Sequence, residues 1–67
     1  MNILLNGQPY VLRMDNPMLA DVVDALDLPV QLMAVAVNRQ VVRQADWRAY
    51  PIHPNDRVDI VRAIGGG

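Results

Sequence analysis

The order of hydrophobic and polar residues predicts two strands and a tight turn at the start of the chain. Residues 1–6 and 8–14 each carry an apolar run, and Asn6-Gly7 links them. Asn-Gly is the strongest two-residue hairpin signal, because a type I′ turn needs positive φ at both positions. Pro9 has no N–H to donate to a ladder, so we expect the second strand to lie at a sheet edge.

The pattern then changes from a period of two to the period of a helix. Apolar side chains fall on one helical face at Leu19, Val22, Val23 and Leu26, and aspartates fall on another at Asp21, Asp24 and Asp27. Asn16 as the N-cap and Pro17 at the first helical position would start this helix, and Pro29 would stop it. We interpret the three aspartates as a solvated face, with an acidic docking site or a metal site as the alternatives.

Two more strands are expected after the helix. In residues 32–38, Met33, Val35 and Val37 alternate with small alanines, which is typical of a strand. Arg39-Gln40 would form a tight turn into a very short strand over residues 41–43.

The last third of the chain is predicted to be irregular before it returns to the sheet. Residues 44–56 show no clear period, and their single Trp47 is expected to fill one end of a small core. Asn55-Asp56 indicates a turn, and residues 57–64 form the last strand, in which Val58 and Ile60 alternate with charged residues.

This element order, β-β-α-β-β-β, favours an α+β fold of the β-grasp (ubiquitin-like) type. In that fold the first and last strands lie parallel in the middle of a mixed five-stranded sheet, and one crossover helix packs across one face. We therefore expect one β-grasp domain over residues 1–64 and an exposed C-terminal tail over residues 65–67.

Composition excludes several classes of function. The 67 residues carry a formal net charge of -1, with no basic cluster, so nucleic-acid binding is not expected. No stretch of about 18 apolar residues and no charged-then-apolar leader occurs, so we expect a cytoplasmic protein that does not enter a membrane. Cysteine is absent, which excludes disulfides and thiolate metal sites.

The sequence also lacks most of the side chains that enzymes use as nucleophiles. It contains no Ser, Thr, Cys, Lys or Glu, and its single His53 lies between prolines in an expected turn. A lone histidine without a second ligand or an orienting partner is interpreted as a solvated loop residue. We therefore predict that the protein is not an enzyme and binds no metal or cofactor of its own.

Aspartates, His53, Tyr10 and Tyr50 are the side chains left that could react, and the one reactive group that the sequence cannot lack is the α-carboxylate of Gly67. Gly65, Gly66 and Gly67 have no Cβ atoms, so they can pass through a narrow channel and approach a nucleotide closely. Three extended residues reach about 10 Å, enough to extend from a docked surface into a buried site. A frayed terminus or a cloning remnant is the alternative explanation of this tail.

The whole chain resembles the ThiS-type sulfur carriers of thiamine biosynthesis, in the ubiquitin-like ThiS/MoaD superfamily. The resemblance rests on the length, on the stretch AVAVNRQVVRQADW and on the Gly-Gly end. Asn55-Asp56 stands where the family usually has Gly-Asp. Asparagine can take the place of this glycine because it also adopts positive φ. The chain lacks the Phe-Pro-Pro-Val-like stretch of the molybdopterin carriers, which favours the thiazole branch.

The resemblance implies a function for the tail. An E1-like (ThiF-like) adenylating enzyme would use ATP to convert the Gly67 carboxylate to an acyl-adenylate. Sulfur from a persulfide donor, such as a cysteine desulfurase, would then displace AMP and give a C-terminal thiocarboxylate. The thiocarboxylate would deliver its sulfur to a ThiG-like thiazole synthase. The free carrier is expected to be a monomer. A carrier for molybdopterin or another pathway, or a ubiquitin-like modifier conjugated through Gly67, remains an alternative.

The helix-free face of the sheet is the expected docking surface for these partners. Val61, Ala63 and Ile64 are the candidates because they lie nearest the tail, and alternation places Val61 and Ala63 on the face opposite Val58. Ordinary sheet packing is the alternative role for the three candidates.

Overall fold

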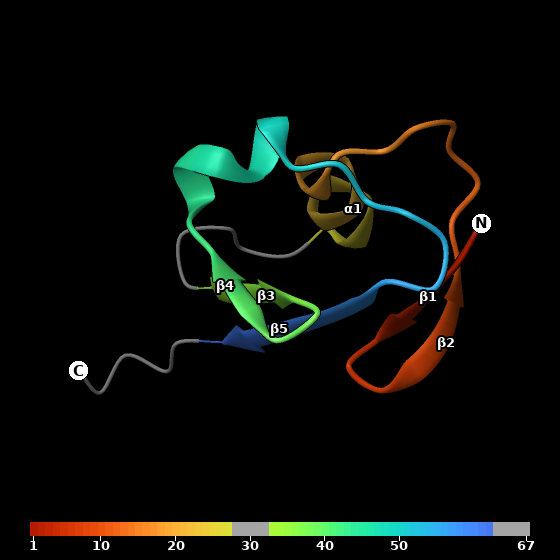
Figure 1. The fold of residues 1–67 in the computed structure, drawn as a ribbon, viewed down its shortest axis with the longest axis horizontal. Helices are drawn as coiled ribbons and strands as arrows, with labels where there is room; N and C mark the ends of the chain where they lie inside the picture. The colour runs from red at the N-terminus through yellow and green to blue at the C-terminus, as the bar shows by residue number, and fades with distance from the viewer. Residues whose placement is uncertain (28–32, 63–67) are drawn as a thin grey trace.

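The computed structural model describes residues 1–27 and 33–62, and it confirms the β-grasp prediction (Figure 1). The elements follow in the order β1 (Asn2–Leu5), β2 (Gln8–Val11), α1 (Leu19–Leu26), β3 (Met33–Val37), β4 (Gln40–Val42), the 3₁₀ helix η2 (Gln44–Ala49) and β5 (Arg57–Arg62). In the part of the chain that is described, no helix is long and apolar enough to cross a membrane.

The five strands form one sheet in the order β2-β1-β5-β3-β4. β5 is parallel to β1, with Leu4 opposite Arg57, and antiparallel to β3, with Val35 opposite Ile60. The last strand therefore lies at the centre, between the two halves of the chain. β2 lies at an edge, as we expect from the missing N–H of Pro9.

The first turn adopts the geometry that its sequence requires. Asn6 and Gly7 have φ values of 51° and 81°, both in the left-handed region. Glycine and asparagine adopt this region at low cost, so the two strands are joined by only two residues.

The helix begins two residues later than the sequence analysis predicts. Met18 is the N-cap, and Asn16 has a φ of 49°, which an N-cap residue in extended backbone cannot have. Met18 forms a β-bridge with Pro51, and the backbone N–H of Met18 donates a 2.8 Å hydrogen bond to the Asp21 carboxylate. The tertiary bridge to Pro51 and the local hydrogen bond to Asp21, and not the Asn-Pro signal, set the start of α1.

The C-terminal end of α1 also differs from the prediction. Asp27 has a φ of 53° and donates its N–H to the Asp24 carbonyl, so the helix ends at Leu26. Asp27 is therefore not part of the helical acidic face. Pro29, the predicted stop, lies outside the described residues.

Two local predictions in the second half were also wrong. The turn after β3 uses Asn38 and Arg39, both with positive φ, so Gln40 already belongs to β4. The segment predicted to be irregular begins with η2, which carries Trp47 into the core. Asn55 has a φ of 70°, which confirms the turn before β5.

The core lies between α1, η2 and one face of the sheet. Its buried apolar side chains are Ile3, Leu12, Leu19, Val22, Val23, Val35, Val37, Val42, Trp47, Ile52 and Val58. Burial of apolar area supplies the main driving force for folding. The opposite face of the sheet is not covered by any described element, and Figure 1 shows α1 and η2 on the same side of the sheet.

Candidate functional site

The candidate site lies on the uncovered face of the sheet, where β5 leads toward the C-terminus. Side chains of successive strand residues point to opposite faces, and Val58 of β5 is fully buried in the core. Val61 therefore projects from the uncovered face, and 62% of its surface is exposed. The prediction that Val61 lies opposite Val58 is confirmed.

Val61 belongs to a small apolar area that spans three strands. Ala34 of β3 lies directly opposite it, and Ala36 lies opposite Val41 of β4, which is 76% exposed. We call these four residues, Val61, Ala34, Ala36 and Val41, the apolar patch. Residues opposite one another on a sheet have Cβ atoms about 5 Å apart, so the patch is continuous.

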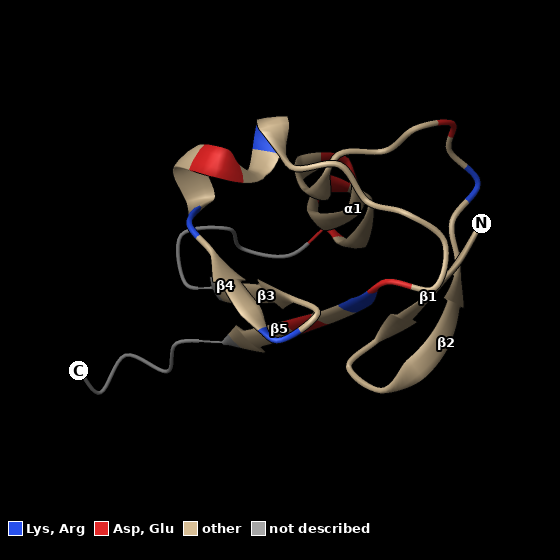
Figure 2. Ribbon diagram, viewed as in Figure 1, with Lys and Arg blue, Asp and Glu red and all other residues tan. Residues whose placement is uncertain are grey.

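Charged residues separate the apolar patch from the other half of the uncovered face. Arg57 and Asp59 of β5 form an ion pair, with Nε and Oδ2 3.1 Å apart. Figure 2 shows these charges along the middle of the sheet. Beyond them, Leu4 and Val11 are exposed on β1 and β2. An exposed ion pair contributes little to stability, so its main effect here is to give the face a polar boundary.

The other predicted site residues lie outside the residues that the structure describes. Ala63 and Ile64, the two further docking candidates, and the tail residues Gly65, Gly66 and Gly67 all follow Arg62, the last described residue. The described part of β5 ends immediately before them. The candidate site is therefore the apolar patch at the point where the chain continues toward Gly67.

Asn38 fixes the start of β5 beside the β3–β4 turn. Its Oδ1 accepts a hydrogen bond from Arg57 N–H, and its Nδ2 donates to Asp56 Oδ1, each at 3.0 Å. The other Asp56 oxygen accepts from the backbone N–H of His53 at 2.8 Å. His53 itself is an exposed residue of the loop, as the sequence analysis predicts.

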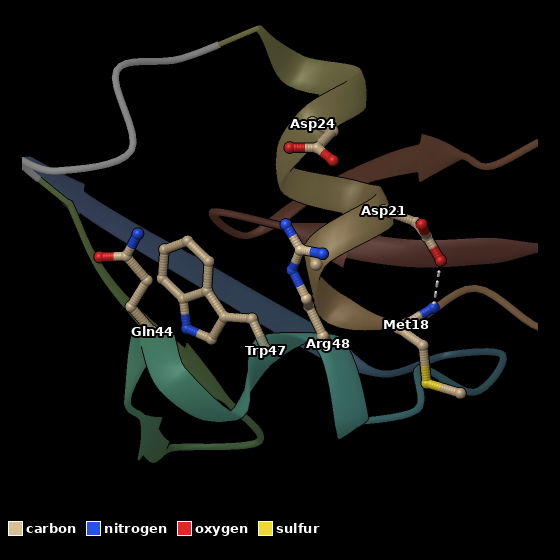
Figure 3. A pocket seen from close by; sticks show the side chains of 7 residues that line it. Met18, Asp21, Asp24, Gln44, Trp47 and Arg48 are labelled. Carbon is tan, nitrogen blue, oxygen red and sulfur yellow. Dashed lines mark hydrogen bonds between the residues drawn. The ribbon is translucent and has the colours of Figure 1, made fainter.

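A hollow lies on the helix side of the molecule, between α1 and η2 (Figure 3). It has a volume of about 280 Å³, and its lining includes Asp21, Asp24, Trp47 and Arg48. Asp21 already accepts a hydrogen bond from Met18 N–H, and Trp47 fills the core. Among the described residues, no three acidic or histidine side chains come close enough to hold a metal ion.

Comparison with known proteins decides the family. A family model described as the ThiS family matches residues 3–67, which is nearly the whole chain. The chain belongs to the ThiS family. This match includes the three terminal glycines and the strands that form the apolar patch.

Solved structures agree with the family at the level of the fold. The chain is similar to a crystal structure of a thiamine biosynthesis protein (ThiS) from Geobacter metallireducens, with a TM-score of 0.89, 23% identity and full coverage of both chains. It is also similar to an NMR structure of a thiamine biosynthesis protein from that organism, with a TM-score of 0.83 and 23% identity, covering 100% of this chain and 88% of that one. No curated protein matches the sequence.

The sequence analysis found one member of the patch and missed the other three. Ala34 and Ala36 were recognised only as the small residues that alternate with valines in β3. Val41 was not singled out, because Val41 and Val42 stand side by side in a three-residue strand and either could face the core. The pairing of Val35 with Val42 is what turns Val41 outward.

Proposed function

We propose that this member of the ThiS family is a sulfur carrier of thiamine biosynthesis. The observation that carries the proposal is the family match over residues 3–67, because the matched segment includes the tail on which such a role depends. The two similar structures are thiamine biosynthesis proteins, which points the same way.

In this role the α-carboxylate of Gly67 is the reacting group. An E1-like adenylating enzyme binds the carrier and ATP, and a carboxylate oxygen attacks the α-phosphate, which releases pyrophosphate and leaves an acyl-adenylate. The terminal sulfur of a persulfide donor then attacks the acyl carbon and AMP leaves, which gives an acyl disulfide; a second thiol attacks the donor sulfur, breaks the S–S bond and forms a disulfide with the donor. The resulting thiocarboxylate supplies sulfur to a thiazole synthase.

The carrier contributes recognition and delivery, not catalysis. The apolar patch offers an enzyme a surface with two exposed valines, Val41 and Val61, and exposed apolar clusters are typical of interaction sites. Gly65, Gly66 and Gly67 follow in the sequence a strand that the sheet holds on both sides at Val58. ATP is the substrate of the partner enzyme, and the carrier needs no cofactor.

A reconstituted reaction tests the proposal. The carrier is incubated with the adenylating enzyme, ATP and a persulfide donor, and its intact mass is measured. We expect an increase of about 16 Da, because sulfur replaces one carboxylate oxygen at the activated acyl group.

Two other outcomes would contradict this role. Formation of a larger species joined to a second protein through Gly67 would identify a ubiquitin-like modifier. A thiocarboxylate that supports molybdopterin synthesis but not thiazole formation would assign the carrier to the other branch.

A further inference from the structure

The central strand β5 has a neighbour on both sides for only part of its length. On one side it pairs with β3 from Val58 to Arg62. On the other side, the parallel register with β1 ends where Leu5 lies opposite Val58. Figure 1 shows β5 continuing past the β1–β2 hairpin. The end of β5 that leads to the C-terminus therefore has one open side.

Asn6 marks the point at which the β1 side of β5 becomes open. Its N–H donates to the Val58 carbonyl at 2.9 Å, and its side-chain Oδ1 accepts from the Ile60 N–H at 2.8 Å. The Asn6 side-chain oxygen thus accepts the hydrogen bond that a backbone carbonyl of β1 would accept if that strand were longer. At Gly7 the chain turns away into β2.

The hydrogen bonds that β5 makes to β3 and to Asn6 show to which side its next backbone groups point. The Arg57 carbonyl accepts from Asn38 N–H on the β3 side, whereas Val58 and Ile60 bond to Asn6 on the β1 side. Because the direction alternates along a strand, the Ile60 carbonyl and the Arg62 N–H also point to the β1 side. Within residues 1–27 and 33–62, neither group has a hydrogen-bond partner.

We propose that this open edge, formed by the Ile60 carbonyl and the Arg62 N–H, binds an extended strand of the enzyme that acts on the C-terminus. The inference rests on the proposed function for the choice of partner. Exposed strand edges recognise extended segments through their main-chain groups, and the added strand continues the sheet. Here it would occupy the position that β1 vacates after Leu5.

The edge lies beside the apolar patch and directly before the tail. Val61, between the two open backbone groups, belongs to the patch, so one partner surface can contact both. A strand paired at Ile60 and Arg62 would also fix the direction of the chain at the point where residues 63–67 begin. Strand pairing would therefore aim the Gly67 carboxylate as well as bind the carrier.

The other two edges of the sheet are less suited to strand addition. The β2 edge contains Pro9, and β4 has only three residues, and both features are typical of edges that resist pairing. A second copy of this chain is the alternative occupant of the open edge, and a measurement of self-association tests for it.

A pair of variants at one position isolates the backbone donor. Arg62→Pro removes the N–H and places a ring at the open edge, whereas Arg62→Ala also removes the arginine side chain but keeps the N–H. Both should fold, since that N–H makes no hydrogen bond within the described chain and proline is tolerated at a strand edge. Thermal melting of the two variants checks this.

Calorimetry then measures binding of each variant to the adenylating enzyme. We expect the Kd of Arg62→Pro to exceed that of Arg62→Ala by 10-fold or more, on the order of the contribution of one or two hydrogen bonds together with the steric block. In hydrogen exchange of the wild-type carrier, the Arg62 amide should exchange quickly when free and become protected when the enzyme is added.

The remaining outcomes separate the two proposals. Equal Kd values for the two variants, with both still gaining about 16 Da in the sulfur-transfer reaction, would overturn strand docking and leave the carrier function standing. A wild-type chain that neither binds the enzyme nor gains mass would overturn both. Self-association of the wild-type chain that Arg62→Pro abolishes would assign the edge to a second copy and overturn the proposal.

Discussion

The indole N–H of Trp47 donates a 2.8 Å hydrogen bond to the carbonyl oxygen of Val42, five residues earlier. Trp47 is only 4% exposed, so this bond is shielded from water. It ties the short edge strand β4 to η2, and the ring itself packs into the core, as the sequence analysis predicts. One side chain therefore connects the last antiparallel strand pair to the helical layer.

Replacing Trp47 with alanine should destabilise the protein by about 3 kcal/mol, the usual cost of truncating a large buried aromatic residue. So small a domain would lose much of its stability. Trp47→Phe is the matched variant, because it keeps a ring and leaves the Val42 carbonyl without its donor. Its melting temperature should lie between those of Trp47→Ala and the wild type. An unchanged melting temperature for Trp47→Ala would contradict the core role.

The Asn6 side chain should hold β5 locally. Asn6→Gly keeps the positive φ but removes the acceptor for Ile60 N–H, so we expect a loss of about 1 kcal/mol and faster exchange of the Ile60 amide. Asn6→Asp keeps an oxygen acceptor and serves as the control. The Val61 amide, which faces β3, should change less. An unchanged Ile60 exchange rate in Asn6→Gly would show that the hydrogen bond does not stabilise β5.

The apolar patch can be tested with two valines of nearly equal exposure. Val61 is 62% exposed inside the patch, and Val11 is 61% exposed on β2 at the far side of the Arg57–Asp59 ion pair. We expect Val61→Arg to raise the Kd for the adenylating enzyme by about 10-fold or more, because it places a charge in the contact. Val11→Arg should have little effect. Similar losses in both variants would place the contact elsewhere.

The tail can be altered without changing the sheet. Deletion of Gly67 should abolish the mass increase in the sulfur-transfer reaction, because the tail becomes one residue shorter and the terminal carboxylate, now on Gly66, no longer reaches the reacting position. The melting temperature should stay unchanged, since no core residue is removed. Gly66→Val should also block the reaction, because its side chain hinders passage through a narrow channel. Thiazole formation by the Gly67 deletion variant would contradict the sulfur-carrier function.

Much of the fold could be predicted because the decisive signals are local. Asn6-Gly7 specifies its turn by backbone preference, Pro9 excludes a central position for β2, and the 3.6-residue period of α1 identifies its buried face. The start of α1 could not be found in this way. Met18 begins the helix because of its bridge to Pro51, which is distant in sequence.

The candidate site was predictable only where alternation along a single strand was unambiguous. Val61 follows directly from the burial of Val58, since the two residues differ by an odd number of positions. Val41 depends on the register between β3 and β4, and the open edge at Ile60 depends on where β1 ends relative to β5. Both are properties of strand pairing, and a single sequence does not encode them in a local pattern.

The central position of β5 also determines when this protein can fold during its synthesis. Leu4 pairs with Arg57, so the middle of the sheet is assembled from the two extremes of the chain. The ribosome makes the N-terminal end first, and the hairpin and α1 emerge without the strand that must lie between β1 and β3. A long-range contact of this kind forms late and slowly. A nascent chain interrupted before Arg57 lacks the centre of its sheet, so proteases that degrade unfolded chains would remove it before it could compete for the adenylating enzyme.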